Sequence, residues 1–425
     1  MRRLSVLAPL LLSTALAQAA PATDVVHWWT SPGETAALRA LADAYRSAGG
    51  QWRELGVPSS EQARTVVQAR IQAGTPPMAA QFNPSLSFRR LARDGHLTAL
   101  DDLAAQGRWA DVLPPVLLDA VRVDGHVYAV PLSIHMPAWL WSSKAALAKA
   151  GVRQEPRSVD DLFAALDRLQ AAGLIPLAHG GQPWQDLNLF NALLANQGGR
   201  ELYLAVLRDR DPAALQSDAL RQVLLNFKRL RRYVDAASPG RSWADTTALL
   251  TSGRAGLMFM GDWVKGEFSA AGQQPGRDYG CAPGLSPRAP YIVDGDVLVF
   301  PRDASGAVTP ANPASPTPAQ ALLARVASAR GTQLAFSARK GSVPARTDLD
   351  TRSLDTCAQQ GAAALRDAQR LVGNTEMLLP PDQLTALEKA VSDYWNRDIP
   401  APAMQQTLAR ILQRPDNNTA PRRQP

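Results

Sequence analysis

VVHWWTSPGE, residues 25–34, joins a short apolar strand to two adjacent tryptophans, a Pro-Gly turn and a carboxylate. We expect the strand to span Val25–Trp29 and a helix to follow it over Glu34–Ser47, where apolar residues recur at helical spacing. Neighbouring side chains of a strand point to opposite faces, so only one of the two indole rings can face a ligand. We expect Trp28 to pack in the core and Trp29 to take the ligand side.

The rest of the chain alternates strands and helices in its first hundred residues and becomes mostly helical later. This order predicts an α/β fold with helices packed on a sheet. Expected strands lie at 25–29, 79–82, 138–141, 255–260 and 297–300, helices at 34–47, 61–73, 88–95 and 142–150, a β-hairpin at 121–131 around Asp124-Gly125, and a mostly helical stretch from Ser158 to about 232.

The N-terminus predicts export. Met1-Arg2-Arg3 precedes an apolar run over Leu4–Leu16, and Ala17-Gln18-Ala19 supplies small residues at the usual cleavage positions. The run is shorter than the ~20 residues that span a bilayer. No cysteine follows it, which argues against a lipid anchor. We therefore predict a signal peptide over 1–19 and a soluble periplasmic protein without direct membrane insertion.

Composition limits the possible classes of protein. The chain has 425 residues, more than one hydrophobic core usually serves, so two domains are expected. A hydrophobic content of 46% excludes general disorder. The formal charge is +7, of which Arg2 and Arg3 leave with the signal peptide, and the basic residues are scattered among acids. This distribution argues against binding of nucleic acid.

Cys281 and Cys357 are the two cysteines of the chain. In an exported protein an even pair favours a disulfide over two free thiols. Two sulfurs without a CxxC motif or clustered histidines make a poor metal site, so we expect neither a metal nor another cofactor.

The sequence contains no HExxH, GxSxG, P-loop or GxGxxG motif, so no common catalytic pattern is present. Aromatic and polar residues instead stand at the ends of predicted elements, among them Trp243, Trp263 and Asp296. Strand ends around a cleft are where α/β proteins bind ligands. Stacking of a pyranose on tryptophan contributes ~0.5–1.5 kcal/mol per ring beyond area burial, and hydrogen bonds from charged groups contribute ~1.5–3 kcal/mol each. This combination favours a sugar as ligand.

The chain resembles the cluster-1 extracellular solute-binding proteins of ABC transporters, and within them the glucose/mannose-type sugar-binding proteins. The resemblance runs from about Val25 to Pro344. The matching stretches are His27-Trp28-Trp29-Thr30-Ser31, Ala73-Gly74-Thr75-Pro76-Pro77, Tyr128-Ala129-Val130-Pro131-Leu132 with Ile134-His135, Trp141-Ser142-Ser143-Lys144, Pro156-Arg157-Ser158-Val159-Asp160-Asp161-Leu162, Phe259-Met260-Gly261-Asp262-Trp263 and Lys340-Gly341-Ser342-Val343-Pro344.

This likeness implies a two-lobe, type II periplasmic binding protein fold with a ligand cleft between the lobes. Crossing strands are expected near 130–136, 290–296 and 340–344. The expected parts are an N-terminal α/β lobe of 20–131 and 294–340, a mostly helical α/β C-terminal lobe of 132–293 and 341–413, and a mobile tail of 414–425.

The resemblance also implies which residues contact the sugar: Trp29, Glu34, Gln81, His135, Trp243, Trp263, Asp296 and Lys340. Sugar binders of this type often carry histidine where Asn83 stands, and another in the region of Met377. The Asn83 amide can still donate to and accept from a hydroxyl, so we include it. Trp29, Gln81, Asn83, Asp296 and Lys340 are expected from the N-terminal lobe or hinge, and His135, Trp243 and Trp263 from the other lobe.

The expected function is delivery of a hexose such as glucose or mannose to the membrane subunits of an ABC permease, by a monomer without catalytic activity. One alternative is a secreted glycoside hydrolase that uses Glu34, Asp262 or Asp296 as an acid/base pair. Another is a sugar receptor that feeds a sensor kinase. Structural roles are also open: Glu34 and Lys340 suit helix ends, and Asp262 suits the turn before Trp263.

Overall fold

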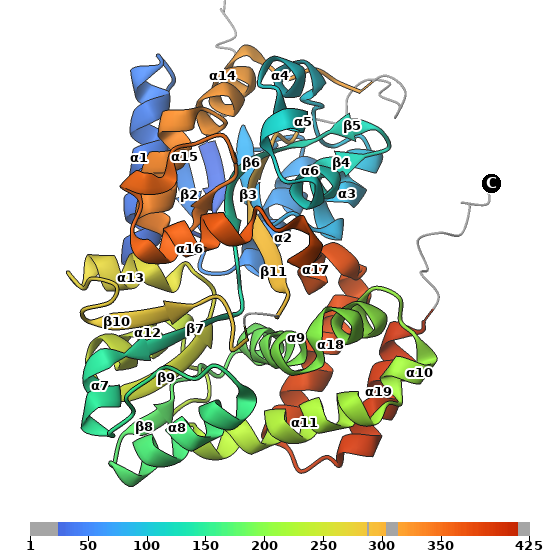
Figure 1. The fold of residues 1–425 in the computed structure, drawn as a ribbon. Coiled ribbons are helices and arrows are strands. Elements are labelled where there is room, and N and C mark those ends of the chain that lie inside the picture. The colour runs from blue at the N-terminus through green and yellow to red at the C-terminus, as the bar shows by residue number, and fades with distance from the viewer. Residues whose placement is uncertain (1–23, 287–288, 303–312, 415–425) are drawn as a thin grey trace, which may run out of the picture.

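The computed structural model describes residues 24–286, 289–302 and 313–414, which form two lobes, each built on its own sheet (Figure 1). The predicted signal peptide and most of the predicted tail lie outside the described residues. The two-lobe α/β fold that we expected is confirmed.

The first sheet has seven strands among the described residues, in the order β12-β6-β11-β3-β1-β2, with β13 paired to β11. Their bounds are β1 (Asp24–His27), β2 (Arg53–Gly56), β3 (Ala79–Phe82), β6 (Ala129–His135), β11 (Tyr291–Val299), β12 (Val343–Pro344) and β13 (Leu371–Gly373). Strands β1, β2 and β3 are parallel to one another, and β11 is antiparallel to both β3 and β6.

The second sheet has the order β10-β7-β9-β8. Its strands are β7 (Trp139–Ser143), β8 (Ile175–Leu177), β9 (Ala255–Met260) and β10 (Tyr279–Ala282), and the small hairpin pairs β4 (Arg122–Val123) with β5 (His126–Val127). The hairpin turns at Asp124-Gly125, as the dipeptide predicted, with both residues at positive φ.

Helices cover both sheets and fill most of the lower lobe in Figure 1. Their bounds are α1 (Pro32–Ser47), α2 (Ser60–Gln72), α3 (Leu86–Arg93), α4 (Asp101–Gln106), α5 (Trp109–Val112), α6 (Pro115–Val121), α7 (Lys144–Lys149), α8 (Val159–Ala171), α9 (Pro183–Leu207), α10 (Pro212–Leu215), α11 (Asp218–Leu230), α12 (Trp243–Thr251), α13 (Val264–Ala270), α14 (Pro318–Ala327), α15 (Arg330–Lys340), α16 (Thr356–Ala364), α17 (Thr375–Leu378), α18 (Pro381–Asn396) and α19 (Ala401–Leu412). No helix among the described residues combines the length and apolar composition needed to cross a bilayer.

Helix α1 begins where the sequence places strong start signals. Ser31 accepts a hydrogen bond from the Glu34 N–H, the Glu34 side chain accepts from the Ser31 N–H, and Pro32 occupies the first turn. Helix α8 begins likewise at Ser158, which accepts from the Asp161 N–H at 3.1 Å, as predicted.

Two long strands carry the chain between the lobes. Strand β6 ends at His135 in the first sheet, and β7 begins at Trp139 in the second sheet. Strand β11 brings the chain back from β10 and pairs with β6 from Asp294 opposite His135 to Val299 opposite Ala129. The short strand β12 joins the first sheet beside β6, so three segments meet at the junction, near the three predicted crossings.

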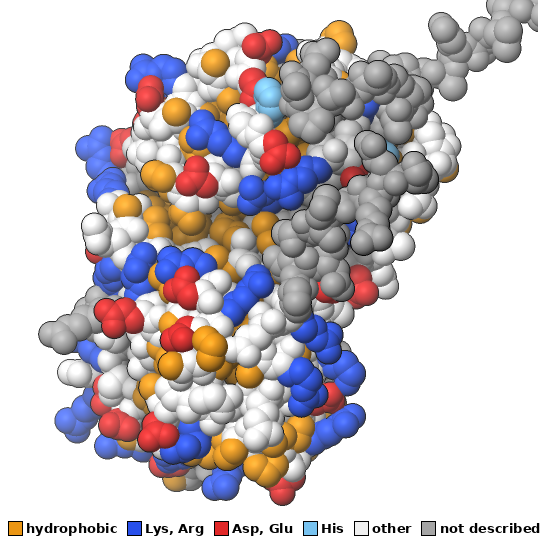
Figure 2. Space-filling view, turned by 90° about the vertical axis from the view of Figure 1, so that its right-hand side faces the viewer, with side chains coloured by type: hydrophobic (Ala, Val, Ile, Leu, Met, Phe, Trp, Pro, Cys, Tyr) orange, Lys and Arg blue, Asp and Glu red, His pale blue; other side chains and the backbone are white. Residues whose placement is uncertain are grey.

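Alternating side chains of the second sheet serve two hydrophobic cores. Trp139 and Trp141 belong to the cluster that continues into the first lobe, whereas Leu140 faces the helical cluster that contains Leu193 and Phe227. The predicted disulfide is confirmed: Cys281 on β10 is bonded to Cys357 on α16, with 6.0 Å between their Cα atoms. Figure 2 shows hydrophobic side chains gathered at the level between the upper and lower halves of one face.

Candidate ligand-binding site

A buried network centred on Asp296 lies at the ends of strands from both sheets. We call it the Asp296 network, and its members are Trp29, Gln81, Ser133, His135, Asp262 and Asp296. Apart from Trp29, each is a polar side chain that is at least nine-tenths buried. Strands β3 and β6 lie on either side of β11, so Gln81, Ser133 and His135 all reach the carboxylate of Asp296.

Asp296 accepts four hydrogen bonds. Oδ1 accepts from the Gln81 amide at 2.7 Å and from the Trp29 indole N–H at 3.2 Å. Oδ2 accepts from Ser133 at 3.3 Å and lies 2.7 Å from His135 Nε2. Burial by itself would raise the pKa of Asp296, but the charges of His135 and Lys340 and these hydrogen bonds outweigh it and lower the pKa.

His135 lies between two carboxylates, because its Nδ1 is 2.6 Å from Asp262 and its Nε2 is 2.7 Å from Asp296. Burial would lower the pKa of this imidazole, but the two carboxylates raise it to about 9. His135 is therefore a cation at neutral pH and donates from both ring nitrogens. Since both nitrogens are engaged, the residue orients Asp262 and Asp296 in this arrangement.

A second buried pair joins α15 to α1. Lys340 Nζ donates to Glu34 Oε1 at 2.9 Å, and Glu34 Oε2 accepts from the N–H groups of Thr30 and Ser31. Burial lowers the pKa of Lys340, but Glu34 and Asp296 raise it by more. Glu34 therefore lies at the start of α1 and Lys340 at the end of α15, as the helix-end roles in the sequence analysis suggested. Their ion pair holds the ammonium group of Lys340 beside the Asp296 network.

Trp263 supplies an aromatic surface from the second lobe. Its half-buried ring lies edge-on to His135 at 5.3 Å between centroids, and Lys340 Nζ lies 5.9 Å from its centroid. Trp184 lies 6.4 Å from the same ring.

The predicted burial of Trp28 and Trp29 is reversed in the structure. Trp29 is 1% exposed and packs edge-on against Phe336, while Trp28 is half-buried. The cause is that β1 ends at His27, so strand alternation does not extend to either tryptophan. Trp29 nonetheless reaches the site, since its indole N–H orients Asp296.

The remaining predicted residues have different surroundings. Asp262 accepts from the Met136 N–H at 3.2 Å as well as from His135, so it orients the strand ends as a turn residue can. Trp243 begins α12 behind the capping Ser242 and is half-buried. Asn83 follows β3 and is also half-buried. The sugar contacts of Trp243 and Asn83 stay predictions.

Ser133 is the member of the Asp296 network that the sequence analysis missed. It lies two residues before His135 on the same strand, so strand alternation places both side chains on one face. Alternation along the matched strand was the signal that could have found it.

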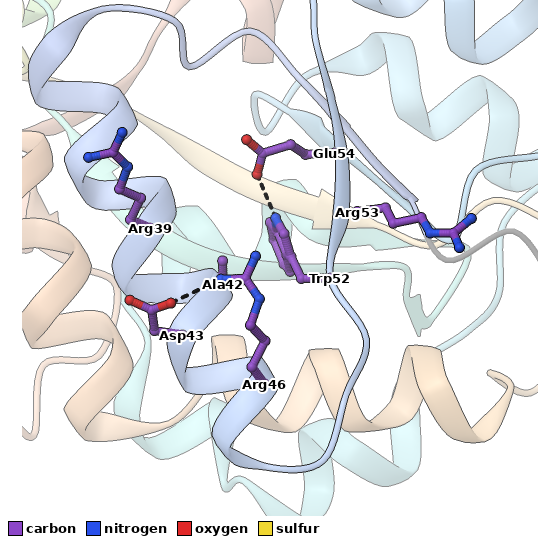
Figure 3. A pocket seen from close by; sticks show the side chains of 7 residues that line it. All are labelled: Arg39, Ala42, Asp43, Arg46, Trp52, Arg53 and Glu54. Atoms are coloured by element: carbon purple, nitrogen blue, oxygen red, sulfur yellow. Dashed lines mark hydrogen bonds and ion pairs between the residues drawn. The ribbon is translucent and has the colours of Figure 1, made fainter.

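A separate pocket lies between α1 and β2 on the outer edge of the first lobe (Figure 3). It has a volume of about 490 Å³ and is lined by Arg39, Ala42, Asp43, Arg46, Trp52, Arg53 and Glu54. Within this pocket Arg46 bonds Asp43 and the Trp52 N–H bonds Glu54. None of the predicted site residues lines it, so we place the candidate site at the Asp296 network. Within the part of the chain that the structure describes, no His, Cys, Asp and Glu side chains gather in a group able to hold a metal ion.

The family model for bacterial extracellular solute-binding proteins matches residues 28–332. The chain belongs to this family. A protein of Rhizobium meliloti described as a probable sugar-binding periplasmic protein is 38% identical over 365 residues, which cover 85% of each chain. A protein of Brucella suis with the same description is 38% identical over 356 residues, which cover 83% of this chain and 82% of that protein.

Solved structures share the fold of this solute-binding protein. The receptor AcbH, described as having an exclusive preference for β-D-galactopyranose, superposes with a TM-score of 0.76 at 18% identity over 91% of this chain and 97% of that one. Maltose-bound MalE3 of T. maritima gives 0.72 at 18% identity over 92% and 99%. The relatives are solute receptors, so the chain is a binding protein and not an enzyme.

Proposed function

We propose that this solute-binding protein binds a hexose such as glucose or mannose in the periplasm and delivers it to the membrane subunits of an ABC importer. One observation supports the proposal: polar groups from both lobes converge at the crossing strands, where His135 bonds Asp296 of the first sheet and Asp262, which follows β9 of the second sheet. The relatives from Rhizobium meliloti and Brucella suis are described as probable sugar-binding periplasmic proteins, which supports the same class of ligand.

The chemistry of the site suits a pyranose. The carboxylates of Glu34 and Asp296 accept hydrogen bonds from hydroxyls, the buried ammonium of Lys340 donates to hydroxyls, and the Trp263 indole offers an apolar face to the ring. Micromolar affinity needs about −8 kcal/mol, which two stacked rings and three charged hydrogen bonds can supply after ordering costs of several kcal/mol. Glu34 and Asp296 are already held by fixed donors, so they would present oriented acceptors to the sugar.

Delivery requires that the ligand change the balance between lobe arrangements. A ligand shifts such a balance only by its different affinity for the two states. Gln81 and Asp296 belong to the first sheet, whereas Asp262 and Trp263 follow β9 of the second sheet. A sugar that contacts both sets would stabilise the closed arrangement, and the permease would recognise that arrangement.

Calorimetric titration of the mature chain with glucose, mannose, galactose, xylose and maltose tests the proposal. We expect micromolar binding of a hexose, loss of binding in Asp296→Asn, and unchanged binding in the control Asp209→Asn, whose carboxylate pairs with Arg208 on the surface. Chromogenic aryl glycosides should show no turnover. Absence of binding to every sugar, with the protein folded, would overturn the proposal.

A further inference from the structure

The lobes touch at a second place, where α13 of the lower lobe meets the beginning of α1 in the upper lobe (Figure 1). Glu267 on α13 reaches across this contact. Its Oε1 accepts from the Ser31 hydroxyl at 2.7 Å and from the Gly33 N–H at 3.0 Å. A carboxylate at a helix N-terminus interacts favourably with the partial positive charge of the exposed N–H groups.

The two partners belong to different rigid parts. Helix α13 is fixed to the second sheet, because Phe268 stacks on Tyr279 with 4.0 Å between ring centroids and also lies against Trp141. Helix α1 packs against α15 in the first lobe through its buried face, which includes Leu41 and Tyr45. Separation of the lobes would therefore break the hydrogen bonds of Glu267.

The turn that Glu267 contacts is the one that holds Glu34. The Ser31 hydroxyl accepts from the Glu34 N–H, and the Ser31 N–H donates to Glu34 Oε2. Glu34 in turn bonds Lys340. A carboxylate from the second lobe thus fixes the orientation of an acid in the first lobe.

Glycines make this contact a close one. A Cβ on Gly33 would lie 2.7 Å from the backbone of Gly266, and a Cβ on Gly266 would lie 2.8 Å from the Arg339 carbonyl oxygen. A Cβ on Gly341 would lie 2.6 Å from the Asp262 carbonyl oxygen. Three backbone segments from both lobes meet here without side chains between them, so the geometry fits one lobe arrangement.

We infer that Glu267 is a positioning residue that binds the first turn of α1 only in the closed arrangement and then holds Glu34 and Lys340 in place for the ligand. The inference rests on the proposed function. It assigns closure to a specific carboxylate rather than to the ligand alone, and it predicts that Glu267 acts on ligand release more than on ligand entry.

Stopped-flow kinetics with the tightest-binding sugar of the panel test this role. Glu267→Ala should raise koff about 10-fold or more and change kon by less than about 3-fold, because interface changes act mainly on dissociation. Glu267→Gln should fall between Glu267→Ala and the wild type, since its amide oxygen still accepts but carries no charge. The control is Glu155→Ala: Glu155 accepts from Ser142 and Lys144 at 2.8 Å each, entirely within the second lobe.

Two further pairs of variant and control distinguish the interlobe contact of Glu267 from effects on local stability. Ser31→Ala should raise koff, whereas Ser59→Ala, which removes the equivalent cap of α2, should not. Gly266→Ala should act like Glu267→Ala, whereas Gly331→Ala should not, because a Cβ on Gly331 meets nothing within 4 Å.

A distance measurement keeps the test independent of the sugar. Spin labels at Leu55→Cys and Leu225→Cys, two exposed side chains on different lobes, report the interlobe distance. Glu267→Ala should lengthen it in the sugar-free protein, and Glu155→Ala should not. Equal distances and equal koff in Glu267→Ala and wild type would overturn the inference. If the wild type binds no sugar, the proposed function fails, and the distance alone decides the role of Glu267.

Discussion

His135 has an unusual position for a histidine, because both of its nitrogens bond carboxylates that come from different lobes. Removing one member of such a buried charged group leaves the others without a partner, which costs about 3–5 kcal/mol. We expect His135→Gln to lower the free energy of unfolding by about 3 kcal/mol at pH 7, and to weaken sugar binding, because Asp262 and Asp296 lose their shared donor.

The pH dependence identifies the charge as the cause. The pKa of His135 is about 9 in the folded protein, above its usual 6.5. Its contribution is therefore complete below pH 6.5 and is lost as pH rises through 9. Urea unfolding at pH 6.5 and pH 10 should show the difference between wild type and His135→Gln shrinking by about 2–3 kcal/mol. A difference that stays constant between these pH values would contradict a charged His135.

Glu388 on α18 should destabilise the folded protein at neutral and higher pH, whereas His135 stabilises it at neutral pH. Burial first, and then the charge of Glu376, raise the pKa of Glu388 to about 7, while Arg64 opposes the shift. A carboxyl group with a raised pKa destabilises the folded state as pH rises from its usual value toward 7. Glu388→Gln should therefore stabilise the protein by about 1 kcal/mol at pH 8 and leave stability nearly unchanged at pH 4, allowing for solvent screening.

Thermal unfolding at both pH values measures this effect. Glu201→Gln, an exposed glutamate on α9, is the control and should shift neither value. Stabilisation of Glu388→Gln that is equal at pH 4 and pH 8 would indicate packing and not charge as its cause.

Single residues were predictable where a motif fixed their place. His135 and Lys340 stand in matched stretches, and Gln81 and Asp296 came from the family resemblance as a whole; the structure brings these four to one place. The burial of Trp29 was not predictable, because it depends on where β1 ends. That end is set by pairing with β2 and β3, which a single segment does not reveal.

At the scale of elements, strands with strong local signals were predicted with their observed bounds. The apolar runs at 79–82 and 255–260 are β3 and β9. The apolar pattern alone predicted only the last part of β11, since Asp294, Gly295 and Asp296 break that pattern at the point where the strand serves the site; the family resemblance implied the crossing near 290–296. Short β10 and β13 were not expected, because tertiary pairing and not composition makes them strands, whereas β12 lies within the crossing near 340–344 that the resemblance implied.

The disulfide joins two of these elements, β10 and α16, across 76 residues of sequence. Closing a loop of that length in the unfolded chain stabilises the folded state by about 4 kcal/mol in the chain-entropy model. We expect Cys281→Ser/Cys357→Ser to lose about 2–4 kcal/mol in denaturant unfolding. Wild type unfolded in a thiol reductant should lose the same amount, and a much smaller loss in both would indicate that the pair does not constrain the chain.

At the scale of the whole molecule, side chains from the two lobes contact each other, which no single element could bring about. The sequence predicted two lobes and three crossings from a family resemblance. It could not predict that Glu267 touches the first turn of α1, because that contact depends on how the lobes sit against each other. Close glycine contacts at Gly33 and Gly266 are invisible in sequence for the same reason.

If both lobes hold the ligand, aromatic rings of the second lobe should matter as much as the acids of the first. Trp263 is half-buried beside His135 and Lys340, so its loss removes stacking area and leaves two cations without their aromatic neighbour. We expect Trp263→Ala to weaken binding of the preferred sugar by about 10-fold or more, through lost stacking and lost burial. Trp243→Ala should weaken it by a smaller factor, because Trp243 has no such charged neighbours among its ring contacts in the described structure.

Isothermal titration with the preferred sugar measures both variants, and Trp52→Ala is the matched control. Trp52 lines the pocket beside the edge strand β2 and packs against Tyr45 with 6.0 Å between ring centroids, and β1 and β3 lie between β2 and the crossing strand β11. Its removal should leave Kd unchanged. Wild-type affinity in Trp263→Ala, or weakened binding in Trp52→Ala alone, would indicate that the sugar binds in the pocket between α1 and β2 and not at the Asp296 network.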